Sequence, residues 1–217
     1  MNEMEKFNKI FTENIVRRCK GKKILLTLTG GMDTRAILSV LCKHNIHADA
    51  FTIEGWNSKR DAEIAKKLVD YVEIIDNHII WKNNNPEEIR AYSEELFKNY
   101  DVVLHGFFMS ELFNKYEDLH KGEDYFENQI ERCSKNCEIL AKRCPMIYHP
   151  AYDLDVQKQL RLLPIIYRRS SSIQRKIIIL NQPDLLRFPL TCYNTKVRLV
   201  RWIYWRLIDA LEILVLK

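Results

Sequence analysis

The sequence has 217 residues, 47% of them hydrophobic and 11% aromatic, with 34 basic against 29 acidic side chains. A chain of this length and composition can bury a hydrophobic core without disulfides or metals, which excludes disordered, collagen-like and disulfide-scaffold proteins. The net charge of +5 is too small to indicate a nucleic-acid-binding protein unless the charges cluster. No run of about 18 apolar residues occurs, so no membrane contact is expected, and the polar N-terminus does not resemble a signal peptide. We therefore expect a cytoplasmic protein whose six cysteines are reduced.

The spacing of apolar residues in the first half of the chain alternates between helical and strand periods. Helices are predicted over residues 4–18, 33–44, 58–68 and 86–98, and strands over residues 23–29, 49–53, 71–75 and 101–105. Parallel neighbouring strands need crossover connections, and right-handed crossovers place helices on both faces of a sheet. The predicted fold class is therefore α/β, a three-layer α/β/α, Rossmann-like arrangement with a parallel sheet whose first strand is central.

The second half of the chain has a helical character. Helices are predicted over residues 111–116, 124–142, 160–179 and 196–216, and residues 145–150 form a break. We expect one domain over residues 1–217, with an α/β part (1–145) and a helical C-terminal part (146–217).

A glycine-rich segment, Leu28-Thr29-Gly30-Gly31-Met32-Asp33-Thr34-Arg35, ends the first predicted strand and begins the next helix. Open α/β sheets bind ligands at this place, where glycines let backbone N–H groups converge and the helix N-terminus carries partial positive charge. The segment predicts an anion site at which the Thr29 and Thr34 hydroxyls donate to phosphate oxygens. Asp33 beside a phosphate would need a divalent cation between the two charges. The alternative interpretation is an ordinary turn with Asp33 as the helix N-cap.

The segment Thr29-Gly30-Gly31-Met32-Asp33-Thr34 resembles the S-G-G-x-D-S pyrophosphate loop of the N-type ATP pyrophosphatases, the PP-loop superfamily. By pattern it is most similar to the synthetase domain of asparagine synthetase. Residues 50–55, 61–68, 104–116 and 186–190 resemble further motifs of that family, in the same order. The resemblance implies an adenine nucleotide alpha hydrolase-like fold, with ATP and Mg²⁺ as cofactors.

The resemblance also implies roles for particular residues. Asp33 would bind Mg²⁺ and would act in catalysis together with Glu111 and Arg187. The implied reaction is attack of a carboxylate on the α-phosphorus of ATP, which gives an acyl-adenylate and pyrophosphate, followed by capture of the acyl group by an amine. The residues implied in nucleotide binding are Leu28, Thr29, Gly30, Gly31, Met32, Asp33, Thr34, Ile53 and Gly106.

Three positions depart from the family motifs. Ser110 and Cys192 stand where the family has aspartates, the first of which binds metal in the family, and Phe107 stands where the family has an acidic residue or glycine. Glu111 could replace the missing carboxylate or could simply cap or pair on a helix. Asn2 stands where a glutaminase domain would have its nucleophilic cysteine, so we expect a stand-alone synthetase-like chain that does not use glutamine.

Cys133, Cys137 and Cys144 share one face of a predicted helix, and His149 lies nearby in sequence. A metal or iron–sulfur site is one interpretation, but the spacing lacks the C-x-x-C pairs usual at such sites and favours free thiols.

Basic residues are concentrated in the C-terminal third: Arg161, Arg168, Arg169, Arg175, Lys176, Arg187, Lys196, Arg198, Arg201 and Arg206. They could neutralise a triphosphate, bind a small-molecule or RNA acceptor, or form solvated helix faces. The apolar side of the last predicted helix suggests core or a homodimer interface. Two alternatives to the adenylating enzyme follow: a tRNA- or RNA-modifying ATP pyrophosphatase, and a nucleotide-binding protein without catalysis.

Overall fold

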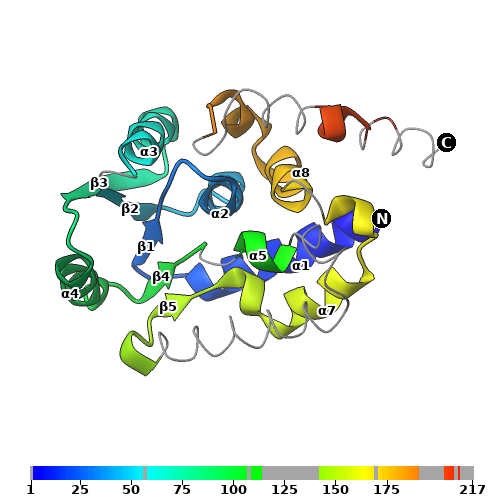
Figure 1. The fold of residues 1–217 in the computed structure, drawn as a ribbon. Coiled ribbons are helices and arrows are strands. Elements are labelled where there is room, and N and C mark those ends of the chain that lie inside the picture. The colour runs from blue at the N-terminus through cyan, green and yellow to red at the C-terminus, as the bar shows by residue number, and fades with distance from the viewer. Residues whose placement is uncertain are drawn as a thin grey trace.

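The computed structural model describes residues 2–55, 58–106, 109–113, 142–168, 171–190, 203–207 and 210, and these form a parallel sheet with helices on both faces (Figure 1). Its elements up to the fourth strand are α1 (Glu3–Cys19), β1 (Ile24–Thr27), α2 (Met32–Lys43), β2 (Ala48–Glu54), α3 (Lys59–Tyr71), β3 (Ile75–Lys82), α4 (Pro86–Phe97) and β4 (Val102–Leu104). The later elements are α5 (Met109–Phe113), β5 (Ile147–Tyr148), α7 (Leu154–Leu162), α8 (Ser172–Asn181) and the short 3₁₀ helices η2 (Pro150–Tyr152), η3 (Ile165–Tyr167) and η4 (Pro183–Arg187).

The sheet of the described residues has the strand order β3-β2-β1-β4-β5, and all neighbouring strands are parallel. Leu26 of β1 pairs with Ala50 of β2 on one side and with Leu104 of β4 on the other, so β1 is central as predicted. The predicted three-layer, Rossmann-like α/β class is confirmed.

The two faces of the sheet bury separate apolar clusters. Leu26 and Leu104 face the larger cluster, to which α1, α2, α3 and α8 contribute. Leu25 and Phe51 face the smaller cluster, in which Phe97 of α4 packs edge-on against Phe51. Burial of these strands on both faces explains why they read as short continuous apolar runs in the sequence.

Local sequence signals account for the helix ends that were predicted well. Asn2 and Glu5 form a capping box at the start of α1, and Gly21, with a φ of 68°, follows its end. Asn85 caps α4 by accepting a hydrogen bond from the Glu87 N–H, and Pro86 occupies the first turn, where no N–H is needed. These helices therefore begin where side chains satisfy backbone donors.

The strand predicted over residues 71–75 is wrong. Helix α3 continues to Tyr71 and is followed by a turn, and the strand β3 begins only at Ile75 and runs to Lys82. β3 lies at the edge of the sheet and about half of its side chains are exposed, so no buried apolar run marks it in the sequence.

Two further predictions in the second half are corrected. The break expected over residues 145–150 contains the short strand β5, which pairs with β4. The single helix predicted over residues 160–179 is wrong: α7 ends at Leu162, Pro164 follows, and α8 begins at Ser172. Most of the helices predicted over residues 124–142 and 196–216 lies outside the described residues, apart from the helical segment 203–207.

The described C-terminal helices pack on the N-terminal part of the chain, α8 along α2 and α7 along α1 (Figure 1). In the part of the chain that the structure describes, no helix is both long and apolar enough to cross a bilayer. The cysteines that can be described, Cys19, Cys42 and Cys144, carry free thiols.

The guanidinium of Arg35 joins the glycine-rich segment to the C-terminal part. Arg35 is fully buried, and its Nη1 donates to the carbonyls of Leu185 (3.2 Å) and Phe188 (2.9 Å). Its Nη2 donates to the carbonyls of Gly30 (2.8 Å) and Pro189 (2.9 Å). Burial lowers the pKa of Arg35 to about 10, so the group is still charged at pH 7. Two segments that are far apart in the sequence are thereby held by one cation.

Replacing Arg35 with methionine should lower the free energy of unfolding by about 3 kcal/mol or more, because buried carbonyl groups lose their donors. Urea denaturation measures this change. Arg187→Ala is the matched control: Arg187 is 74% exposed and forms an exposed ion pair with Asp184, three residues earlier, so its loss should stay within about 0.5 kcal/mol. Equal effects of the two substitutions would contradict a structural role for Arg35.

Candidate functional site

A cleft of about 640 Å³ lies at the carboxyl end of the sheet. It opens between β1 and β4, where the strand order reverses direction, which is the usual ligand site of open α/β sheets. The residues that line it are Thr27, Leu28, Thr29, Gly31, Asp33, Thr34, Phe51, Ile53, Ser58, Asp61, Ser93, Phe97, His105, Gly106 and Ser110.

The glycine-rich segment forms one end of this cleft. The Thr34 hydroxyl accepts from the Thr29 N–H (3.1 Å) and donates to the Thr29 carbonyl (3.2 Å), which closes the segment into a tight loop. The Gly31 N–H donates to the Thr29 hydroxyl at 3.2 Å. Gly31 is the N-cap of α2 and has no side chain to satisfy the N–H groups of the first turn. An anion in the cleft would meet these donors and the positive end of the helix.

Gly106, at the end of β4, packs directly on this loop. A Cβ atom there would lie 2.9 Å from the Thr34 Cγ2 and 3.0 Å from the Thr34 backbone nitrogen. A glycine is therefore required where β4 passes the glycine-rich loop.

Asp33 is not the helix cap that the alternative interpretation required, because the cap position is taken by Gly31. Its carboxylate instead accepts from the Ser110 hydroxyl (2.9 Å to each oxygen) and from the Ser110 N–H (3.2 Å to Oδ2). The side-chain amide of Gln174, on α8, donates to Oδ1 at 2.8 Å. Neutral donors from α5 and α8 thus orient the carboxylate at the edge of the cleft.

The donor set fits Mg²⁺ in its usual mode, in which one or two protein carboxylates assist phosphates and waters. Asp33 would be the ligand of this chain, and its hydrogen bonds are those expected of an oriented metal ligand. Ser110 stands where the family that the sequence resembles has a second carboxylate, and its hydroxyl donates directly to Asp33. Among the residues that can be described, no group of three or more His, Cys, Asp or Glu side chains is placed to hold a metal.

Part of the cleft lining is apolar. Phe51 and Ile53 of β2 face it, together with Phe97 of α4 and Leu28 after β1. A flat aromatic group could pack between these side chains while its anionic end lies on the glycine-rich loop.

His105 and His149 follow β4 and β5 and lie side by side, with ring centroids 5.2 Å apart. Burial lowers the pKa of His105 to about 3, with a smaller contribution from His149. Burial also lowers the pKa of His149 to about 4, and the backbone of His105 opposes this shift in part. Neither ring nitrogen of His149 makes a hydrogen bond of standard geometry. Both imidazoles are therefore uncharged at pH 7.

The structure brings together most of the residues predicted to bind nucleotide. Leu28, Thr29, Gly31, Asp33, Thr34, Ile53 and Gly106 all line the cleft. Gly30 and Met32 belong to the same loop but are buried behind it. The backbone of Glu111 lies in α5, whereas its side chain is outside the parts of the chain that the structure describes.

Arg187 is not among the residues that line the cleft. Its side chain is 74% exposed and pairs with Asp184 at 2.7 Å. The arginine that contacts the loop is instead Arg35, to which the sequence analysis assigned no role. Gln174 was also missed, because a glutamine within an apolar helix gives no signal of a distant partner.

The described basic residues of the C-terminal third make different kinds of contact. Arg168 is 5% exposed and donates to the Leu112 carbonyl at 3.3 Å. Arg175 lies over the Trp205 ring, 5.1 Å from its centroid. Arg169, Lys196, Arg198 and Arg201 lie outside the described residues, as do Cys133 and Cys137 of the cysteine cluster. Cys144 is buried in the apolar cluster under α4.

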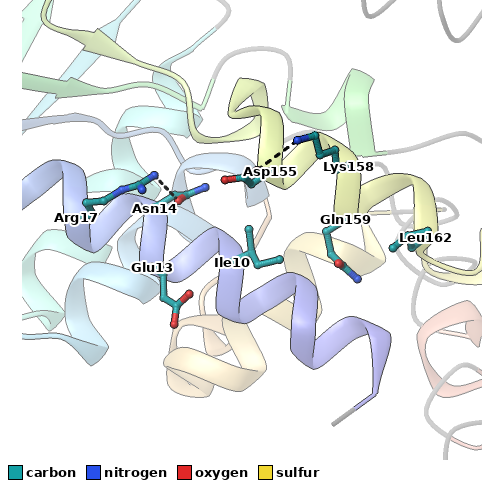
Figure 2. Close-up of a pocket in the computed structure, with 8 residues that line it drawn as sticks. All are labelled: Ile10, Glu13, Asn14, Arg17, Asp155, Lys158, Gln159 and Leu162. Carbon is teal, nitrogen blue, oxygen red and sulfur yellow. Dashed lines mark hydrogen bonds and ion pairs between the residues drawn. The ribbon is translucent and has the colours of Figure 1, made fainter.

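A second groove, of about 560 Å³, lies between α1 and α7, and Figure 2 shows the residues that line it. Two of its lining side chains are acidic, Glu13 and Asp155, and two are basic, Arg17 and Lys158. The groove therefore presents no net charge that would select a ligand.

No family model matches the sequence, and no curated protein matches it either. Membership of the PP-loop superfamily accordingly stays a proposal, supported by the motifs and by their positions around the cleft.

The buried histidines predict a loss of stability in acid. Between pH 7 and pH 5 the unfolded chain takes up protons on both histidines, whose unperturbed pKa is 6.5, while the folded chain does not. The free energy of unfolding should fall by about 3 kcal/mol from these two groups, since each contributes up to about 1.4 kcal/mol per pH unit.

His149→Gln should remove about half of this pH-dependent fall. Urea denaturation at pH 7, 6 and 5 measures it, with replacement of the exposed His44 by asparagine as the control. An unchanged pH dependence in His149→Gln would show that His149 is protonated in the folded protein.

Proposed function

We propose that the cleft binds ATP and that the chain uses it to adenylate a carboxylate or related acceptor before amide formation, in the manner of asparagine synthetase. The observation that carries the proposal is the N-terminus of α2, which lies where the strand order reverses between β1 and β4. Gly31 is its cap residue, and no side chain there accepts a hydrogen bond from the N–H groups of the first turn. The triphosphate would lie on this loop, and the Thr29 hydroxyl would donate to it. The adenine would lie on the apolar wall at Ile53.

The geometry supports this assignment through positioning and charge. Transfer at phosphorus needs fixed donors and charge neutralisation more than covalent participation by the protein. The helix N-terminus supplies the donors, and Asp33 would hold a Mg²⁺ ion that neutralises phosphate charge. Ser110 and Gln174 keep the Asp33 carboxylate oriented. His105, neutral at pH 7, adds no charge that would compete.

Gly31→Val tests the loop. The backbone at Gly31 has a φ of −75° and a ψ of 171°, which valine tolerates, so the fold should survive while the side chain enters the anion site. Calorimetric titration should show Mg·ATP binding to the wild-type protein and a loss of at least about tenfold in affinity for the variant. Leu162→Ala, in the groove between α1 and α7, is the control and should bind normally.

A pyrophosphate-release assay with amino acids and bulk tRNA as acceptors tests turnover. Release from the wild-type protein and its loss in Asp33→Ala would support adenylation, and the productive acceptor would separate the small-molecule from the RNA alternative. Turnover that persists in Asp33→Ala would contradict the assignment of the metal ligand.

The hydrogen bonds from Ser110 to Asp33 favour a second candidate, a nucleotide-binding protein without catalysis. A hydroxyl neutralises no cation, so the site would bind nucleotide with little gain from Mg²⁺. Ser110→Asp should then raise the affinity for Mg·ATP and lower the affinity for ATP without Mg²⁺, because like charges repel unless a cation lies between them. Both affinities follow from titrations with and without chelator. Turnover by the wild-type protein would rule this candidate out.

A further inference from the structure

Asp61 brings a carboxylate to the lining of the cleft. It lies in the first turn of α3, and Ser58 lines the cleft beside it. The Oδ1 atom of Asp61 has almost no exposed surface and accepts no hydrogen bond from the residues that the structure describes. An enclosed carboxylate oxygen without a donor is costly, and native structures rarely keep one without a ligand or ion to satisfy it.

The sequence Ser58-Lys59-Arg60-Asp61 has the pattern of a capping box, which would give Asp61 a partner. The structure does not form the box. The Ser58 hydroxyl donates to the Ile53 carbonyl (3.1 Å) and accepts from the Gly55 N–H (2.7 Å), and the Ser58 N–H donates to the Gly55 carbonyl (3.1 Å). Ser58 thus fastens the end of β2 to α3, and the carboxylate of Asp61 loses its usual helix partner.

The cleft is consequently lined by groups of opposite character. The glycine-rich loop and the N-terminus of α2 offer donors to an anion, whereas Asp61 offers an acceptor with negative charge. The apolar wall with Ile53 and Phe51 also lines this cleft. A ligand that matches it needs an anionic end, a flat apolar body and a hydrogen-bond donor.

We propose that Asp61 is the residue that selects the nucleoside, by accepting a hydrogen bond from a donor of the nucleoside, a ribose hydroxyl or the exocyclic amine of the base. The proposal rests on ATP binding in the cleft. Asp61 would give the cleft a preference among nucleosides. The glycine-rich loop cannot supply this preference, because it would bind the phosphates of any nucleotide alike.

The test compares Asp61→Ala with Glu63→Ala. Glu63 is an exposed acidic residue on the same helix, so both variants lose one negative charge from α3. Asp61→Ala should weaken ATP binding about tenfold in calorimetric titration, as expected for a hydrogen bond to a charged group, and Glu63→Ala should not. Inorganic tripolyphosphate should bind both variants as well as it binds the wild-type protein, and thermal unfolding should show that both are folded.

Nucleotide analogues identify the donor. The three analogues are 2′-deoxyATP, 3′-deoxyATP and ITP, which lacks the amine. The wild-type protein should bind the one analogue that lacks the donor more weakly than it binds ATP. Asp61→Ala should bind that analogue and ATP with the same affinity. If ATP binds the wild-type protein but Asp61→Ala and Glu63→Ala bind it equally, the role of Asp61 is wrong and ATP binding stands. If neither ATP nor tripolyphosphate binds the wild-type protein, the proposed function itself is wrong.

Discussion

The buried guanidinium of Arg35 is the constraint on which the geometry of the cleft depends. It binds the Gly30 carbonyl on one side and the Leu185, Phe188 and Pro189 carbonyls on the other. In a trans peptide the N–H points opposite the C=O, so holding the Gly30 carbonyl inward turns the Gly31 N–H the other way. The loop is therefore held in place by a cation from the helix that it begins, and its form depends on the C-terminal segment being folded against it.

The charge and orientation of each polar group at the cleft depend on the protein groups around it. The positive end of α2 is left without a capping side chain, while the one carboxylate on that helix turn, Asp33, is held by Ser110 and Gln174. The imidazoles of His105 and His149 are kept neutral by burial. A ligand that enters would therefore meet the donors of the glycine-rich loop and the Asp61 carboxylate, beside an uncharged His105.

The βαβ order and the central first strand could be predicted, because buried parallel strands and capped helices leave strong local patterns. The edge strand β3 was misplaced since half of its side chains face solvent, and the two-residue β5 is too short to leave a period. The glycine-rich loop was found because its spacing is local. The contacts of Arg35 with Pro189, of Gln174 with Asp33 and of His149 with His105 were not predicted, because these partners lie far apart along the chain. At Asp61 the local pattern of a capping box does not form, because the Ser58 side chain binds Ile53 and Gly55 instead.

A crystal structure of the protein with Mg²⁺ and a non-hydrolysable ATP analogue tests the central claim most directly. The account predicts the triphosphate on the loop from Thr29 to Thr34, the base against Ile53, and Asp33 next to the metal. An analogue bound elsewhere, for example in the groove between α1 and α7, or a cleft left without nucleotide at a saturating concentration of the analogue, would contradict it.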